Sequence, residues 1–242
     1  MKKTKWMAWL LMGVLLLSGC AEEETETHMD QVFITTQSAL EGGHFFFSGK
    51  VLGVSTEERL ISYYEAEMGK NTFYSVEVTE DYYQCMPDRN ITVCVLGSGE
   101  TFRREGLKKD REYIFDTTLW VEGDQTIFLL PTFHSYMPEL QNGEVYIPVD
   151  GEAVSCGSYE EYREQFDALA AKAKYCPQTV LDAVKLALQG AAERVDPALF
   201  KKMGYKNVDA ALLKKTGETA ASLLEKAQKI EPTWEEIGEL IQ

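Results

Sequence analysis

Residues 72–83 read TFYSVEVTEDYY, and this stretch decides the predicted fold. Apolar and polar side chains alternate along it: Tyr74, Val76, Val78 and Tyr82 share one parity, and Ser75, Glu77, Thr79 and Asp81 share the other. This alternation is typical of a strand that has one face in the core and the other in solvent. The turn residues at 86–90 and the apolar positions of 91–95 then predict a second strand, which forms a hairpin with the first.

Further segments around this hairpin also have the pattern of strands, and they cover residues 45–54, 112–121, 126–130 and 144–149. In the first of them, Gly49 and Gly53 indicate a bulge or a bend. The second and third flank the turn Glu122-Gly-Asp-Gln125 and predict another hairpin. Because no helical segment separates most of these strands, residues 32–150 are expected to form a small antiparallel β-barrel and not a parallel sheet.

The order of these elements resembles the oligonucleotide/oligosaccharide-binding (OB) barrel, particularly the netrin-like version shared with tissue inhibitors of metalloproteinases. The resemblance covers about half of the chain and rests on Ser48-Gly-Lys-Val51, Tyr74-Ser-Val-Glu-Val78 and Gly106-Leu-Lys-Lys-Asp-Arg-Glu-Tyr-Ile114. It implies the barrel fold. In the inhibitor family a free N-terminal cysteine chelates the protease zinc, and this function does not carry over, because the corresponding terminus here is the predicted lipid anchor Cys20.

Residues 157–242 have a helical pattern. Ser158-Tyr-Glu-Glu161 is a capping box, in which the serine and glutamate side chains each accept a hydrogen bond from the backbone of the other residue. Apolar residues then recur at steps of three and four in several segments, which predicts a helical bundle packed on itself or against an open end of the barrel. The predicted fold class is therefore α+β, a small OB-like antiparallel β-barrel followed by a C-terminal α-helical bundle.

The amino end has the features of an export signal. Residues 1–19 combine three lysines with an apolar core, which as a helix would rise only about 18 Å against the ~30 Å of hydrocarbon in a membrane. The signal ends in LSGC at 17–20, which resembles the bacterial lipobox, where acyl chains are attached to the cysteine. The resemblance implies a palmitate-type anchor on Cys20 and a place on the extracytoplasmic face of the cell membrane. The other interpretation is an ordinary secretory signal, which leaves Cys20 as a free or paired thiol.

Acidic residues dominate the exported chain. Residues 20–31 read CAEEETETHMDQ and are predicted to be an extended tether. The whole chain has 24 Lys and Arg against 39 Asp and Glu, a formal net charge of −15, which argues against nucleic acid as a partner. The expected partners are the membrane, through the lipid anchor, and a cell-surface protein or glycan.

Four cysteines follow Cys20 in a chain whose export permits disulfides. Cys85 and Cys94 lie on either side of the turn at 86–90 and share the parity opposite the apolar face of their strands, so a disulfide between them is a candidate. Two free or buried thiols are the alternative. Cys156 and Cys176 bracket the first predicted helix, which holds them too far apart to pair. Since no C-x-x-C pair is present, no metal site is expected, and no motif indicates a cofactor.

Aromatic side chains on a barrel face can stack on sugars or anchor a protein, so the candidate binding residues are Tyr63, Tyr64, Tyr82 and Tyr83. No placed nucleophile or phosphate loop accompanies them, and no catalytic residue is assigned. The sequence thus predicts a membrane-anchored extracytoplasmic lipoprotein with a binding or scaffolding role at the cell surface.

An enzyme remains the alternative interpretation. A hydrolase of cell-envelope polymers would use paired carboxylates, for which Glu77, Glu80 and Asp81 are available, or would use His134. A two-lobed solute receptor is disfavoured, because the chain lacks repeated alternation of strands and helices. An exposed aromatic patch would favour the binding protein, and a cleft that joins a carboxylate to a second polar group would favour the enzyme.

Overall fold

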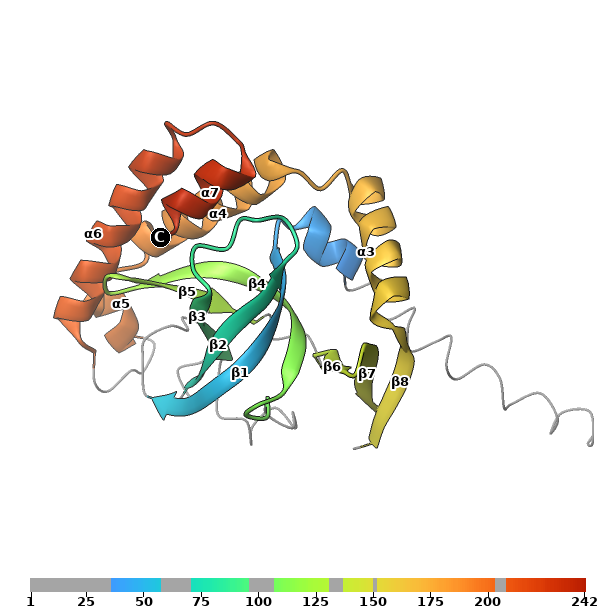
Figure 1. Cartoon of the computed structure of the whole chain (residues 1–242). Coiled ribbons are helices and arrows are strands. Elements are labelled where there is room, and N and C mark those ends of the chain that lie inside the picture. Colours follow the sequence, from blue (N-terminus) through green and yellow to red (C-terminus); the bar gives the residue numbers. More distant parts are fainter. Residues whose placement is uncertain (1–35, 58–70, 96–106, 131–136, 150–151, 203–207) are drawn as a thin grey trace, which may run out of the picture.

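The computed structural model describes residues 36–57, 71–95, 107–130, 137–149, 152–202 and 208–242 (Figure 1). Several predictions lie outside these residues, namely the signal peptide 1–19, Cys20, the tether 20–31, Tyr63, Tyr64 and His134. Within the described ranges the chain has an α+β fold, in which helices pack against a mixed eight-stranded sheet.

The strands are β1 (Phe45–Glu57), β2 (Asn71–Asp81), β3 (Asn90–Val95), β4 (Glu112–Glu122), β5 (Gln125–Leu129), β6 (Glu139–Gln141), β7 (Glu144–Val149) and β8 (Glu152–Ser158). Both predicted hairpins are confirmed, because β2 pairs antiparallel with β3, and β4 with β5. The sequence does not predict β6 and β8. Neither strand contains a buried side chain, so both lack the apolar alternation that marks a strand in a sequence.

Five of the strands form a ring. β1 pairs with both β2 and β4, so the order β1-β2-β3-β5-β4 returns to β1. β3 and β5 are parallel, with Val93 opposite Phe128, and the prediction of a purely antiparallel sheet is therefore wrong here. Parallel neighbours need a crossover, and the chain makes it by passing through β4 between β3 and β5.

β1 is irregular along its edge with β2. Its pairing with β2 shifts register between Ser48 and Gly49 and again between Val51 and Gly53, which confirms the predicted bulge. Gly49 has no room for a side chain, because a Cβ there would lie 2.5 Å from Cγ1 of Val76 on β2. The close approach of the two strands thus explains the glycine.

Helical residues 36–41 precede β1, and the later helices are α3 (Tyr159–Ala173), α4 (Pro177–Glu193), α5 (Pro197–Lys202), α6 (Ala210–Ala227) and α7 (Trp234–Leu240). The capping box of Ser158 and Glu161 is confirmed at the start of α3. Thr233 caps α7, and its hydroxyl accepts a hydrogen bond from the backbone N–H of Glu236 at 3.2 Å. In the described part of the chain, no helix combines the length and the apolar character needed to cross a membrane.

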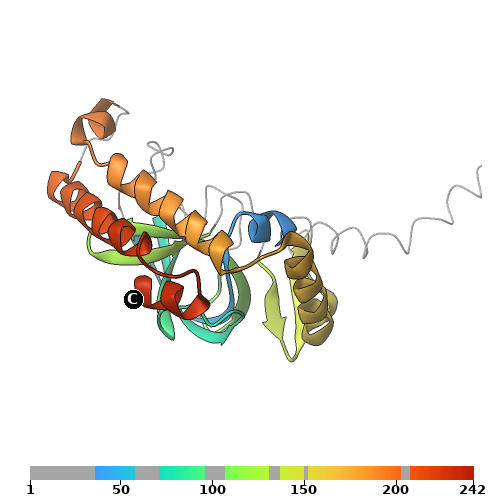
Figure 2. The same cartoon turned by 90° about the horizontal axis from the view of Figure 1, so that it is seen from above.

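The predicted C-terminal helical bundle, packed on itself or against an open end of the barrel, is not confirmed, because the helices cover two different parts of the sheet. α3 packs on β7 and β8, and its Phe166 meets Phe46 of β1 with 5.0 Å between ring centres. α4 and α6 pack on each other and on β4, with α7 beside them (Figures 1 and 2). The apolar stripe of an amphipathic helix can pack on any apolar surface, and this sheet offers more than one. The stripes in the sequence therefore do not determine which surface each helix covers.

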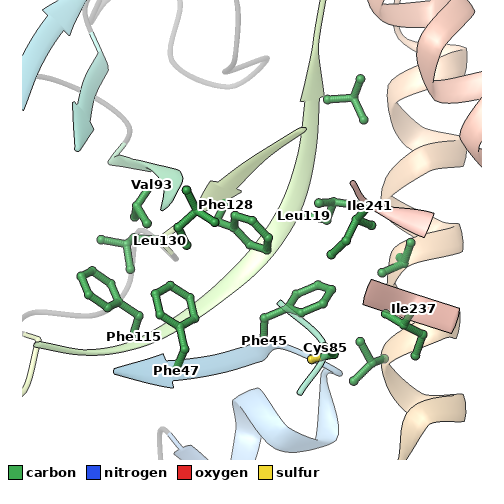
Figure 3. Close-up of a cluster of buried hydrophobic side chains, with 14 of the residues drawn as sticks. Phe45, Phe47, Cys85, Val93, Phe115, Leu119, Phe128, Leu130, Ile237 and Ile241 are labelled. Atoms are coloured by element: carbon green, nitrogen blue, oxygen red, sulfur yellow. The ribbon is translucent and has the colours of Figure 1, made fainter. Parts of the chain in front are cut away.

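One core cluster joins the ring to the C-terminal helices, and Figure 3 shows part of it, including Phe45, Phe47, Phe115, Phe128, Ile237 and Ile241. The rings of Phe47 and Phe115 stack with 5.0 Å between their centres. The core therefore runs across the predicted boundary between residues 32–150 and 157–242. It also anchors α7, which forms one wall of the candidate site.

Candidate functional site

Tyr82 and Tyr83, two of the predicted binding residues, follow directly after β2. Asp81 shapes this turn, because its carboxylate accepts hydrogen bonds from the backbone N–H of Tyr83 at 3.2 Å and of Met86 at 2.7 Å. Gln84 adopts the left-handed backbone conformation, with φ of 57°. The neighbouring tyrosines enter different surroundings: the Tyr82 hydroxyl bonds to α3, whereas the Tyr83 ring stacks on α7.

Five residues join β1 and β2 to α3, and we call them the seam: Ser48, Glu80, Tyr82, Tyr159 and Arg163. The hydroxyl of Tyr159 donates to a carboxylate oxygen of Glu80 at 2.6 Å and lies 3.0 Å from the hydroxyl of Tyr82. The buried Ser48 hydroxyl bonds to Tyr82 at 3.0 Å and to Tyr159 at 3.1 Å. Each hydroxyl of the seam thus has a partner, as polar groups require when they leave water.

Arg163 completes the seam from the α3 side. Its Cζ atom lies 3.8 Å from the centre of the Tyr82 ring, which is a cation–π contact. The guanidinium also lies 3.7 Å from a carboxylate oxygen of Glu80 and 3.7 Å from one of Asp167. The seam therefore holds a cation on an aromatic ring beside two carboxylates.

The seam tyrosines remain protonated at physiological pH. Burial raises the pKa of Tyr82 and of Tyr159 above the ordinary value of 10.0, and for Tyr159 the neighbouring Tyr82 and the hydrogen bond to Glu80 raise the pKa further. A protonated phenol donates hydrogen bonds and does not act as a base or nucleophile. The seam thus fits a structural role, the attachment of α3 to the sheet.

Tyr83 belongs to an aromatic stack. Its ring centre lies 4.9 Å from that of Trp234 on α7 and 4.8 Å from that of Tyr175, and Trp234 also stacks on Tyr175 at 5.5 Å. The Tyr83 hydroxyl is buried and has no hydrogen-bond partner among the described residues. Burial raises the pKa of Tyr83 to about 12. Tyr83 therefore contributes its ring to this place and not its hydroxyl.

A groove of about 640 Å³ lies beside the stack, and its lining residues are Tyr82, Tyr83, Gln84, Met86, Trp234, Glu235, Gly238, Glu239 and Gln242. The aromatic and methionine side chains in the groove are half-buried, whereas the glutamines and glutamates are exposed. Glu235 and Glu239 bring two carboxylates, and the described lining residues include no lysine or arginine. It therefore combines an apolar surface with a polar, negatively charged one.

α7 and the turn after β2 are held against each other. The backbone of Gly238 lies close to that of Cys85, so that a Cβ at position 238 would sit 3.4 Å from the Cys85 carbonyl oxygen. The side chain of Gln242 donates a hydrogen bond to the carbonyl of Pro87 at 3.1 Å. Ile237 of α7 is buried in the same core cluster as Cys85. These contacts position both walls of the groove.

The structure does not bring the predicted disulfide pair together. Cys85 and Cys94 are not joined by a disulfide, and they are buried in different clusters. In the register of the hairpin, the residue opposite Cys94 is Phe73. Cys85 lies beyond the end of β2 and against α7, so parity counted along the sequence no longer decides which side chains face each other.

The carboxylates considered for hydrolysis are engaged separately. Glu77 pairs with Arg89 at 2.7 Å, Glu80 belongs to the seam, and Asp81 shapes the turn. Carboxylates that hydrolyse a glycosidic bond must flank the same cleft, and these three take part in three different contacts. Among the residues described, no group of three or more His, Cys, Asp or Glu side chains is arranged to hold a metal ion.

Sequence reasoning missed the contribution of α7 to the site. Trp234 is half-buried, whereas Ile237 and Ile241 are fully buried. The signal in the sequence was the pair Glu235 and Glu239, two like charges four residues apart and next to an aromatic residue.

Comparison with known proteins adds no assignment. No protein-family model matches the chain, and no curated protein matches it in sequence. Function is therefore argued from the residues that the seam and the groove bring together.

Proposed function

We propose that the protein is a lipoprotein held on the extracytoplasmic face of the cell membrane by acyl chains on Cys20, and that it binds a partner there. The signal and its LSGC ending support the anchor, and the acidic tether at 20–31 would keep the folded part away from anionic lipid. The observation that carries the binding role is the groove. Half-buried aromatic rings beside exposed polar groups are a common composition of binding sites.

The five-stranded ring supports an OB-like barrel as the scaffold of this binding protein, since the OB-fold is a five-stranded, partly open barrel. OB-folds commonly use the loop between the fourth and fifth strands for binding. Here the backbone N–H of Gly123 in that turn donates to the hydroxyl of Thr216 on α6 at 2.8 Å. Because α6 occupies the turn, we place the binding role at the groove.

Fatty-acid labelling tests the anchor. In cells fed an alkyne-tagged fatty acid, the parent chain and the matched control Cys176→Ser are expected to take up label, and Cys20→Ser is expected to take up none. The control also loses one thiol but keeps the lipobox. A parent without label, or a Cys20→Ser chain labelled as strongly as the parent, would contradict the anchor.

The binding role is tested with the full chain in non-ionic detergent. Partners captured by the parent and by the control Trp120→Phe, which lies outside the groove, are expected to be lost from Trp234→Ala and from Glu239→Lys. Glu239 is exposed, so its substitution changes the groove without disturbing the core. The same partners on all four chains would mean that the groove is not the binding site.

A further inference from the structure

We propose that the groove binds a basic segment of a protein partner, with a lysine or arginine side chain on Trp234 and in contact with Glu235 and Glu239. This inference rests on the proposed function in one respect, that the groove is the binding site, and is independent of the lipid anchor. Two features carry it: the groove is negatively charged, and the same chain already binds a cation with the same kinds of side chain in the seam.

The seam supplies the internal precedent. There the guanidinium of Arg163 covers the Tyr82 ring at 3.8 Å and lies 3.7 Å from carboxylate oxygens of both Glu80 and Asp167. The groove brings together an aromatic ring, Trp234, and two carboxylates, but none of its described lining residues is cationic. In the seam, Arg163 is the cation that lies on an aromatic ring beside two carboxylates. A cationic ligand would take the same place in the groove.

The two carboxylates that α7 contributes to the groove are like charges four residues apart on one helix. Glu235 and Glu239 are exposed, and neither forms an ion pair with a residue that the structure describes. Like charges four residues apart repel each other on a helix, and Glu239, in the last turn, also meets the negative end of the helix dipole, whereas Glu235, in the first turn, lies near the favourable positive end. On α6, by contrast, Lys214 and Glu218 have opposite signs at the same spacing. A cationic ligand would relieve the repulsion on α7.

The remaining lining favours a peptide as the source of the cation. Gln84 and Gln242 add exposed amides, which donate to and accept from peptide groups. Tryptophan is the aromatic residue that attracts cations most strongly, and Trp234 is held in place by its stacking on Tyr83 and Tyr175. An acidic or phosphorylated ligand would meet two unneutralised carboxylates, so charge selects against it.

The test is a titration of the full chain, purified in non-ionic detergent, against dye-labelled pentalysine, followed by fluorescence anisotropy. The double variant Glu235→Gln/Glu239→Gln is expected to weaken binding about fivefold, as for the loss of two partly exposed ion pairs. The matched control is Glu160→Gln/Glu164→Gln, an exposed pair with the same spacing on α3 and outside the groove. It is expected to weaken binding by less than about twofold.

Other variants separate the groove from the general negative charge of the protein. Replacement of the four tether glutamates, Glu22, Glu23, Glu24 and Glu26, by glutamine is also expected to weaken binding by less than about twofold. Trp234→Leu is expected to weaken it about fivefold through the loss of the cation–π contact. Circular dichroism of each variant identifies any loss of fold, and the exposed Glu→Gln pair gives the answer even if Trp234→Leu unfolds.

Three outcomes would overturn the proposal. The first is that the α3 or tether variant weakens binding as much as Glu235→Gln/Glu239→Gln does, which would indicate general electrostatic attraction. The second is that neutral maltopentaose competes with pentalysine at equal concentration, which would indicate a sugar site. The third is that pentalysine does not bind at all. The mass of the same purified chain reports acylation of Cys20, so a failed anchor and a failed groove are read separately.

Discussion

The seam and the groove begin at adjacent residues, Tyr82 and Tyr83, and differ in what completes them. In the seam, the hydroxyls are hydrogen-bonded and Arg163 covers the aromatic ring. In the groove, the rings of Tyr83 and Trp234 lie beside two carboxylates of α7, and none of the described lining residues is cationic. The comparison teaches that one pair of tyrosines can provide both a structural contact, satisfied within the chain, and a surface left for a ligand.

The largest effect is expected from Phe166→Ala, which removes the ring on which the seam packs. Phe166 is fully buried, and its ring centre lies 5.1 Å from Tyr82 and 5.0 Å from Phe46. The free energy of unfolding should fall by about 3–5 kcal/mol in denaturant titrations. The control Leu186→Ala, at a side chain that is 73% exposed, should change it by less than about 0.5 kcal/mol. If Phe166→Ala and Leu186→Ala lowered the free energy of unfolding equally, α3 would not be held on the sheet through Phe166.

Removal of one seam hydroxyl comes next. Tyr159→Phe deletes the donor to Glu80 and one partner of Ser48, and is expected to lower the free energy of unfolding by about 1–2 kcal/mol. Tyr146→Phe is the matched control, because Tyr146 donates to Glu144 at the same 2.6 Å distance but at an exposed place. Its effect on the free energy of unfolding should be much smaller than that of Tyr159→Phe, because solvent competes for an exposed hydrogen bond. If both variants unfold at the same denaturant concentration, the seam is no stronger than a surface contact.

Alkaline pH should weaken the fold through the stacked tyrosine. Between pH 10 and about pH 12 the unfolded chain loses the Tyr83 proton while the folded chain keeps it, because burial raises the folded pKa to about 12. Unfolding then releases a proton, so stability falls as the pH rises through this window. Denaturant titrations at several pH values should show a shallower fall for Tyr83→Phe than for the parent. Identical slopes would contradict the burial of this hydroxyl.

The smallest effect is expected from Tyr83→Phe at neutral pH. The substitution removes a buried hydroxyl that has no partner among the described residues and keeps the ring on Trp234 and Tyr175. Stability should be unchanged or higher by up to about 1 kcal/mol, as measured by denaturant titration beside Tyr159→Phe. A loss as large as that of Tyr159→Phe would mean that the two neighbouring tyrosines do not differ as described.

Much of the fold was predictable because local patterns decide it. The hairpin of β2 with β3, the turn at 122–125 and the capping box at Ser158 each depend on residues a few positions apart, and each is confirmed. The alternation in 72–83 is confirmed only in part, because Phe73, on the parity predicted to face solvent, is buried with Cys94 and Ile127. The parallel pairing of β3 with β5 and the distribution of helices over two parts of the sheet depend on contacts between distant segments, which periodicity does not encode.

The site was predictable only in part. The sequence indicates Tyr82 and Tyr83 as aromatic residues at a strand end. It does not indicate that their side chains enter different surroundings, which depends on the turn that the Asp81 carboxylate stabilises. The contribution of Trp234 and Glu239 comes from a helix about 150 residues further along the chain. Their place beside Tyr83 is a result of the core packing of α7.

The most direct test of the central claim, that the groove and not the seam or the acidic tether is the binding surface, is photo-cross-linking. Full-length chain in non-ionic detergent is irradiated with pentalysine that carries a photoreactive group, and the modified residues are located by mass spectrometry. The account predicts cross-links within residues 82–86 and 234–242. Cross-links confined to the tether at 20–31 or to α3 would contradict it.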